Sequence, residues 1–272
     1  MGIILIVNTK ILIKMKKLKN LLSAVILLPF CCLAQSDEME TDRPSESFTP
    51  TIVLKKHFQV EAGFRKEYDN NEGERSNEYL YPTALLKYGV SKKLELRLLI
   101  EEEADYDYIP EKHKTAAGLQ PVKLGFKYNL FDEKGALPKT SVIARADIPK
   151  FASPDFKGDF VAPLFRLAME NSLTKKLSLV YNIGEEWEED DVHGEFFYSI
   201  GPQLEITDKF KIFAEVFGNL SKEQTAKNTF DAGFLYQVTP NFQFDVFGGT
   251  ALSDNAPDNF IEAGISLRLP RN

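Results

Sequence analysis

The 272-residue chain has very little cysteine, tryptophan or histidine. Its two cysteines, Cys31 and Cys32, lie in an apolar N-terminal stretch. If that stretch is removed, the remaining chain has no thiol, which excludes disulfides, thiolate metal sites and cysteine nucleophiles. The three histidines, His57, His113 and His193, show no ligand spacing, and the His-Glu-x-x-His motif is absent. We therefore expect no metal site and no cofactor.

Beyond its first 34 residues the chain also lacks a long hydrophobic run. The mean hydropathy of −0.24 does not fit a helical membrane protein, whose spans need about 20 consecutive apolar residues. It does fit a membrane barrel, because barrel strands are apolar at alternate positions only. With 21 phenylalanines and 10 tyrosines, the chain has the aromatic side chains that a barrel places at the membrane interfaces.

Positive charge is in the minority. The chain has 33 basic and 40 acidic residues, and five of the basic ones but none of the acidic ones lie within 1–34. Removal of that stretch leaves 28 basic against 40 acidic residues, a net charge of about −12. Because binding to nucleic acid needs a basic face, we expect no nucleic-acid partner.

The N-terminal stretch predicts a signal peptide at residues 1–34. A basic region at 15–19 precedes an apolar region at 21–33, and Ala34 is a small residue suited to a cleavage site. The true start is either Met1 or Met15. The alternative is a single transmembrane anchor, but the apolar run is short for a span and contains a proline.

After about residue 50, the sequence consists of about twelve stretches in which apolar and polar residues alternate. The stretches 94–101 and 261–269 show the alternation most clearly. Such lengths exceed the five or six residues typical of a soluble strand. They suit a tilted membrane strand of about nine to eleven residues.

The connections between these stretches alternate between short and long. The short connections are 91–93, 174–176, 207–209 and 239–241, with a somewhat longer one at 132–139. The long, charged ones are near 68–77, 104–117, 149–158, 186–194, 219–228 and 251–259. Tight turns on one side and long loops on the other, around an even number of strands, are typical of bacterial outer-membrane barrels.

A soluble β-sandwich or a closed calycin-like barrel is the alternative to a membrane barrel. The alternation within one strand fits either, because only the direction of the apolar face differs. The signal segment, the even strand count and aromatic residues near the strand ends favour the membrane. These aromatic residues are Tyr79, Tyr81, Tyr106, Tyr108, Phe131, Trp187, Phe196, Phe197 and Tyr198.

The fold class predicted is therefore all-β: an antiparallel, up-and-down transmembrane β-barrel of about 12 strands, preceded by a signal peptide. The barrel occupies residues 52–269, and the polar segment 35–51 is expected to be periplasmic. Whether residues 36–51 also lie in or under the lumen as a partial plug stays open. We expect a monomer in the bacterial outer membrane, in contact with outer-membrane lipid.

Charged residues on the alternate face predict a lumen with side chains of both signs. A complete network of ion pairs would nearly close a barrel of this size, whereas an incomplete one would leave a charged path for a permeant. The candidate lumen-lining residues are Glu61, Arg65, Glu95, Arg97, Lys123, Lys127, Arg145, Asp147, Arg166, Glu170, Asp231, Glu262 and Arg268.

Catalytic and calcium sites are poorly supported. Ser199 and His193 are the only nearby pair of the kind used by outer-membrane lipid hydrolases, and no third partner is evident. The acidic clusters near 101–107 and 185–191 lack the spaced glycine of a calcium loop, so solvated loops are expected there. We therefore assign no catalytic residue and expect that the chain is not an enzyme.

The chain resembles an outer-membrane barrel family labelled as transporters or as "MetA-pathway of phenol degradation" proteins. The resemblance extends from about residue 40 to the end and is most specific at the TDRPSES segment. It rests on Glu40-Thr41-Asp42-Arg43-Pro44, Ser45-Glu46-Ser47-Phe48-Thr49-Pro50, Phe58-Gln59-Val60-Glu61, Tyr81-Pro82, Lys87-Tyr88-Gly89, Glu95-Leu96-Arg97-Leu98, Gly118, Leu124-Gly125, Lys127-Tyr128 and Leu130. The resemblance implies a barrel that takes up small organic molecules.

Three functions follow from this reading. The first is a channel or facilitator for small solutes, with aromatic or hydrophobic molecules as candidates. The second is a closed structural or surface-interaction barrel without transport, whose long acidic loops carry the function. The third is an outer-membrane lipid-modifying enzyme. The sequence does not identify the permeant.

Overall fold

The structure is a computed structural model, and it describes residues 39–71, 74–109, 112–221 and 225–269. The expected signal peptide at 1–34 and the next four residues lie outside the described residues. Among the described residues, no helix is long and apolar enough to cross a membrane.

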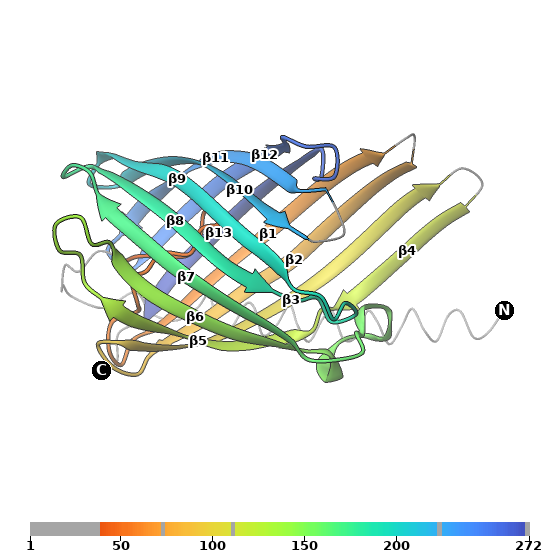
Figure 1. The fold of residues 1–272 in the computed structure, drawn as a ribbon, viewed down its shortest axis with the longest axis horizontal. Coiled ribbons are helices and arrows are strands. Elements are labelled where there is room, and N and C mark those ends of the chain that lie inside the picture. Colours follow the sequence, from red (N-terminus) through yellow and green to blue (C-terminus); the bar gives the residue numbers. More distant parts are fainter. Residues whose placement is uncertain (1–38, 72–73, 110–111, 222–224, 270–272) are drawn as a thin grey trace. The chain divides into compact units, whose positions relative to one another are not determined.

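Strands make up nearly all of the regular structure (Figure 1). Two short 3-10 helices are η1 (Pro149–Phe151) and η2 (Pro154–Phe156). The strands are β1 (Phe58–Asn71), β2 (Glu74–Gly89), β3 (Leu94–Ile109), β4 (Lys112–Leu119), β5 (Val122–Phe131), β6 (Lys139–Ile148), β7 (Ala162–Ser172), β8 (Leu177–Glu186), β9 (Glu195–Thr207), β10 (Phe210–Leu220), β11 (Lys227–Thr239), β12 (Phe242–Ala251) and β13 (Asn259–Leu269).

These strands form one closed antiparallel sheet. Each strand from β5 to β13 pairs with the next, β13 pairs with β1, and β1 to β3 complete the ring. Strand β4 pairs with residues 102–109 of β3, and β5 pairs with residues 94–99 of the same strand. Together β4 and β5 therefore occupy one strand position in the ring. The ring therefore has twelve strand positions, which confirms the predicted up-and-down barrel of about 12 strands.

The barrel is apolar outside and polar inside. In β3, Leu96 is 50% exposed on the outer surface, whereas its neighbour Glu95 is 0% exposed on the inner face. In β5 and β13, Lys127 is likewise 0% exposed and Ile265 is 47% exposed. A soluble barrel would point its apolar face inward. The side-chain directions therefore exclude the soluble alternative and suit a barrel surrounded by lipid.

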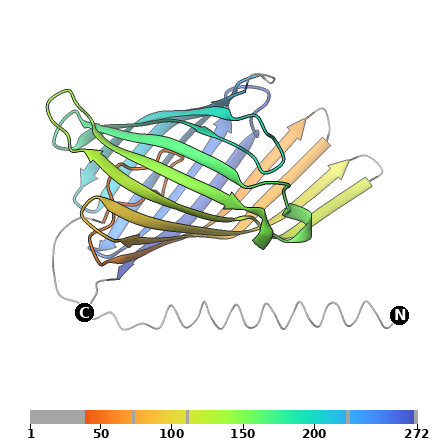
Figure 2. The ribbon, with the colours of Figure 1, turned by 60° about the horizontal axis from the view of Figure 1, so that its bottom comes forward.

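Two of the predicted long loops are wrong. The region 68–77 lies largely in β1 and β2, and most of 104–117 lies in β3 and β4, so both hairpins extend far beyond the other strands (Figures 1 and 2). Backbone ladder bonds do not need apolar side chains, so the pairing continues through charged residues. Cross-strand contacts such as Tyr79 with Tyr106, whose ring centroids are 5.7 Å apart, support the extension.

The other connections have the predicted lengths. Residues 149–158 contain η1 and η2, and 187–194 and 252–258 lie outside the strands. Only two residues separate β9 from β10 and β11 from β12. We call the end with the short turns the turn end and the opposite end the loop end. The first strand begins at Phe58, so the predicted barrel segment 52–57 precedes the wall rather than belonging to it.

One edge in the wall is open. Among the described residues, β4 pairs with β3 only, and its other edge is not continued by a strand. There, Leu119 donates its N–H to the Ser153 hydroxyl at 2.9 Å, and β4 packs against η2. The wall between β4 and β7 is therefore closed by loop contacts instead of a ladder of backbone hydrogen bonds.

Candidate functional site: the occupied lumen

A stretch without regular secondary structure lies inside the ring. We call residues 39–54 the plug segment; it precedes β1 and is drawn in red and orange in Figures 1 and 2. Its polar groups contact inward side chains from strands on every side of the barrel, as detailed below. Of the segment 35–51, which was expected to be periplasmic, the part that the structure describes begins at Met39 and lies inside the lumen.

Asp42 is the most heavily bonded residue of the plug segment. Its carboxylate accepts from Arg97 at 2.7 Å, Lys127 at 2.8 Å and Lys87 at 3.3 Å, which belong to three different strands. Burial by itself would raise the pKa of Asp42, but these three cations hold it well below the usual range. Asp42 is thus an ionised carboxylate that neutralises three converging cations.

Arg43 bonds to a neighbouring part of the ring, β12 and β13, on the other side of β1. Its guanidinium donates to Glu262 at 2.9 Å and to Asp245 at 3.1 Å. Gly63 and Gly264 face each other across β1 and β13, and a Cβ at either would lie within about 2.5 Å of this guanidinium. The two glycines therefore leave the space that Arg43 occupies.

Glu46 and Ser47 bind a third region of the wall. Glu46 donates its N–H to Glu215 at 2.6 Å, and its carboxylate accepts from Arg65 at 2.8 Å. The Ser47 hydroxyl donates to Glu215 and lies 2.6 Å from the Ser199 hydroxyl. A buried carboxylate and a buried hydroxyl of the wall are therefore satisfied by the plug segment, as buried polar groups must be.

Phe48 packs into a recess between β3, β6, β7 and β8. Asn182 accepts from the Phe48 N–H at 2.7 Å and donates to the Phe48 carbonyl at 3.0 Å. The ring packs against a buried apolar cluster of Ile143, Leu164 and Ala168. The guanidinium carbons of two arginines lie close to its centroid, Arg97 at 5.2 Å and Arg166 at 4.9 Å. This is the only aromatic ring of the plug segment, and it is held by both cation–π and apolar contacts.

The segment leaves the lumen along β5, β6 and β3. Lys127 donates to the Thr49 carbonyl at 2.7 Å, and Ser141 donates to the Pro50 carbonyl at 2.5 Å. The Val53 N–H then donates to Glu95 at 2.8 Å. Backbone groups of an irregular chain are thus bonded to wall side chains, which is how non-helical backbone persists at membrane depth.

The space between the plug segment and one side of the wall is small. A cavity of about 20 Å³ lies between it and β9 to β11, beside Arg43, Lys211 and Phe213. A cavity that size holds about one water molecule, whereas benzene fills an engineered cavity of about 150 Å³. This cavity beside the plug segment has no room for an organic solute.

The thirteen predicted lumen residues fall into three groups in the structure. Seven contact the plug segment: Glu61, Arg65, Glu95, Arg97, Lys127, Arg166 and Glu262. Three pair within the wall: Lys123 with Glu101 at 2.7 Å, and Arg145 with Asp147 at 2.7 Å. The others are Glu170, opposite Lys139, Asp231, fully buried opposite Glu215, and Arg268, bonded to Asn241 at the turn end.

Several wall residues of this site were missed in the sequence. Lys87, Asn182, Ser199, Glu215 and Asp245 all contact the plug segment. Each alternates with apolar neighbours, so the same period of two would have placed them on the inner face. The sequence of the plug segment shows no periodicity from which its contacts could be predicted, because the segment is neither strand nor helix.

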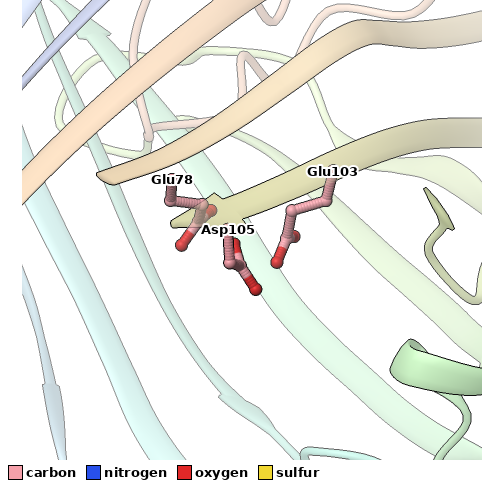
Figure 3. A group of neighbouring side chains, drawn as sticks. All are labelled: Glu78, Glu103 and Asp105. Carbon is pink, nitrogen blue, oxygen red and sulfur yellow. The ribbon is translucent and has the colours of Figure 1, made fainter. Parts of the chain in front are cut away.

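Beyond the plug segment, the lumen is acidic toward the loop end. Figure 3 shows Glu78 of β2 and Glu103 and Asp105 of β3 with their carboxyl groups close together. One oxygen from each lies within 4.8 Å of the others. The expectation of a solvated loop near 101–107 is therefore wrong, because these residues belong to a paired strand and those at odd positions face inward.

The candidate hydrolase pair is not assembled. Ser199 lies in the lumen wall against Ser47, whereas His193 lies in the connection from β8 to β9 and contacts Asp191 at 3.0 Å. The two side chains have different partners, so neither activates the other as a nucleophile and a base would.

Replacing Asn182 with alanine is expected to loosen the plug segment. The Asn182→Ala variant leaves the buried N–H and carbonyl of Phe48 without their partner, at a cost of roughly 1–3 kcal/mol. The measurement is the rate at which a protease cleaves the N-terminal segment of the folded barrel in detergent. Faster cleavage than in the parent chain is the expected result. An unchanged rate, with Asn171→Ala as a control on β7, would contradict it.

Comparison with known proteins defines the fold. A family model described as "Putative MetA-pathway of phenol degradation" matches residues 41–269. The structure is similar to the COG4313 outer membrane channel from Pseudomonas putida F1, with a TM-score of 0.67, 10% identity, and coverage of 83% of this chain and 100% of that chain. It is also similar to the translocator domain of the autotransporter NalP from Neisseria meningitidis, with a TM-score of 0.51, 11% identity, and coverage of 79% and 90%. No curated protein matches the chain.

Proposed function

Because this chain belongs to the MetA-pathway phenol-degradation family and is an outer-membrane β-barrel, we propose that it is a gated facilitator for small aromatic or hydrophobic solutes. The observation that carries the proposal is the plug segment. The lumen is occupied by a stretch of the chain that is bonded to the wall almost entirely through hydrogen bonds and ion pairs. Water can replace such contacts when the segment moves, so the closure is reversible in principle.

The other features of the barrel also have roles in such a facilitator. The inward charges predicted from the sequence line the path above and around the plug segment. The outward apolar face contacts outer-membrane lipid, and the ring is complete within one chain, so a monomer suffices. The long connections at the loop end face outward and the short turns face the periplasm.

A closed structural barrel is the second candidate, and the 20 Å³ cavity favours it. The two functions differ in one respect, which is whether the plug segment moves. If it never leaves its wall contacts, the barrel transports nothing and its extended hairpins carry the function.

Uptake of ring-labelled phenol tests the proposal. Cells of a porin-deficient Gram-negative strain that make the chain are expected to take up phenol several-fold faster than cells with an empty vector. The folded state of the barrel is checked by its heat-modifiable migration on a gel. Equal uptake in the two strains, with the barrel folded in the outer membrane, would refute the facilitator and leave the closed barrel.

A further inference from the structure

The recess that holds Phe48 has the properties of a binding site for an aromatic ring. We infer that it is the solute site of the proposed facilitator, and that Phe48 occupies it as an internal substitute for the solute when the lumen is closed. The inference rests on the proposed function and adds to it the residues that recognise the solute. It names the solute class as a single aromatic ring with a substituent that forms hydrogen bonds.

Ring recognition comes from two guanidinium groups and an apolar floor. Arg97 and Arg166 approach the ring centroid to 5.2 and 4.9 Å, within the range of a cation–π contact. Ile143, Leu164 and Ala168 supply the apolar surface. A saturated ring of the same size would keep the apolar contact but lose the attraction of both cations.

The two arginines are positioned by the wall as well as by the plug segment. Arg166 donates to Glu186 at 2.6 Å, and its guanidinium carbon lies 3.4 Å from the centroid of the Phe197 ring. Arg97 donates to Glu95 at 3.0 Å. These partners stay in place when the segment moves, so the recess is pre-organised for another ring.

The polar substituent would be recognised by Asn182. Its amide currently accepts from the Phe48 N–H and donates to the Phe48 carbonyl. When Phe48 leaves, the same amide has a donor and an acceptor without a partner, beside an apolar recess. A hydroxyl group on the ring satisfies one or both of them, whereas an unsubstituted hydrocarbon leaves both unpaired at a cost.

Replacement of the Phe48 ring by the ring of the solute couples solute binding to opening of the lumen. A solute ring binds the recess only after Phe48 has left, so it stabilises the conformation in which the plug segment is displaced. The solute therefore favours its own passage, and a molecule that cannot replace the Phe48 contacts does not.

Removing the internal ring tests the inference directly. The Phe48→Ala variant of the full chain, purified in detergent, is expected to bind phenol about tenfold more tightly than cyclohexanol, because two cation–π contacts are worth about 1–2 kcal/mol together. Binding is followed by saturation-transfer NMR on the ligand signals. The parent chain, with the recess filled, should show at least tenfold weaker phenol binding than the variant.

Two further variants make the result specific. Phe213→Ala removes an equal ring from another part of the inner wall, where Phe213 packs against Phe247, and should not create the preference. In the Phe48→Ala background, Arg166→Lys keeps the charge but loses the planar guanidinium and should reduce the phenol preference. Phe48→Ser also removes the ring and serves if the alanine variant does not fold; it should show the same preference for phenol over cyclohexanol.

Three results would overturn the inference: no phenol binding to folded Phe48→Ala, equal binding of phenol and cyclohexanol, or the same preference in Phe213→Ala. This assay needs no transport, so it is independent of the uptake measurement. Barrel-dependent phenol uptake without binding in Phe48→Ala would reject the site and keep the facilitator. Binding in Phe48→Ala without barrel-dependent uptake would reject the facilitator on which the site depends.

Discussion

A barrel that lacks residues 39–53 is expected to conduct ions about tenfold better than the parent chain in a planar bilayer. In the parent chain, the cavity between the plug segment and β9 to β11 measures only about 20 Å³. Without the segment, water fills the space, and it solvates the charges that now pair with Asp42 and Arg43. The wall itself should persist, since its ladder bonds run between neighbouring strands around a closed ring.

A disulfide lock is the matched control for this result. The Ser47 and Ser199 hydroxyls lie 2.6 Å apart, close to the sulfur–sulfur length of about 2.05 Å, so a Ser47→Cys, Ser199→Cys pair should cross-link the segment to β9. Apart from Cys31 and Cys32 in the expected signal peptide, the chain has no other cysteine. The oxidised variant should show the lowest conductance, and a reducing agent should restore the parent value. Equal conductance in the deleted, locked and parent barrels would contradict a gate formed by this segment.

The Asp42→Ala variant is expected to lose about 3–5 kcal/mol of stabilisation of the closed state, because removal of one partner leaves buried charges unpaired. Three cations, Lys87, Arg97 and Lys127, converge on this carboxylate, and the first is also paired with Glu61. Mutual repulsion among them, no longer offset, should expel the segment and admit water. We expect a lower unfolding temperature in detergent together with a raised ion conductance.

The pH range of this contact follows from the lowered pKa of Asp42. Burial opposes ionisation, but the three cations outweigh it and hold the pKa well below the usual aspartate value. A depressed pKa gives stabilisation that is fully present above the unfolded-state value and is lost as the pH falls through the folded-state value. Asp42 therefore stays ionised at neutral and mildly acidic pH.

Glu40→Gln is the matched control for Asp42→Ala. Glu40 belongs to the same segment, but its contact with Lys211 is 3.4 Å long and its side chain is 35% exposed. The cost expected for a partly exposed pair is below about 1 kcal/mol. If Asp42→Ala and Glu40→Gln lower the unfolding temperature equally, the convergence of three cations on Asp42 is not what holds the segment.

The face of each strand residue could be predicted from the sequence alone. Alternation in 94–101 assigned Glu95 and Arg97 to the inner face, and the structure has both buried there. The short turns could also be predicted from the sequence, because turn chemistry depends on a few adjacent residues. Both properties are local: successive side chains of a strand point to opposite faces whatever its partners are.

The ends of the strands and the state of the lumen were decided only by the tertiary structure. Residues 68–77 and 104–117 resemble loops by composition, yet pairing with neighbouring strands keeps them extended. The plug segment is held in the lumen because Asp42 meets Lys87 and Lys127, residues 45 and 85 positions away, and Arg43 meets Glu262, 219 positions away. Such contacts require the ring to close around an irregular segment, and no periodicity in the sequence encodes which distant side chains that segment will meet.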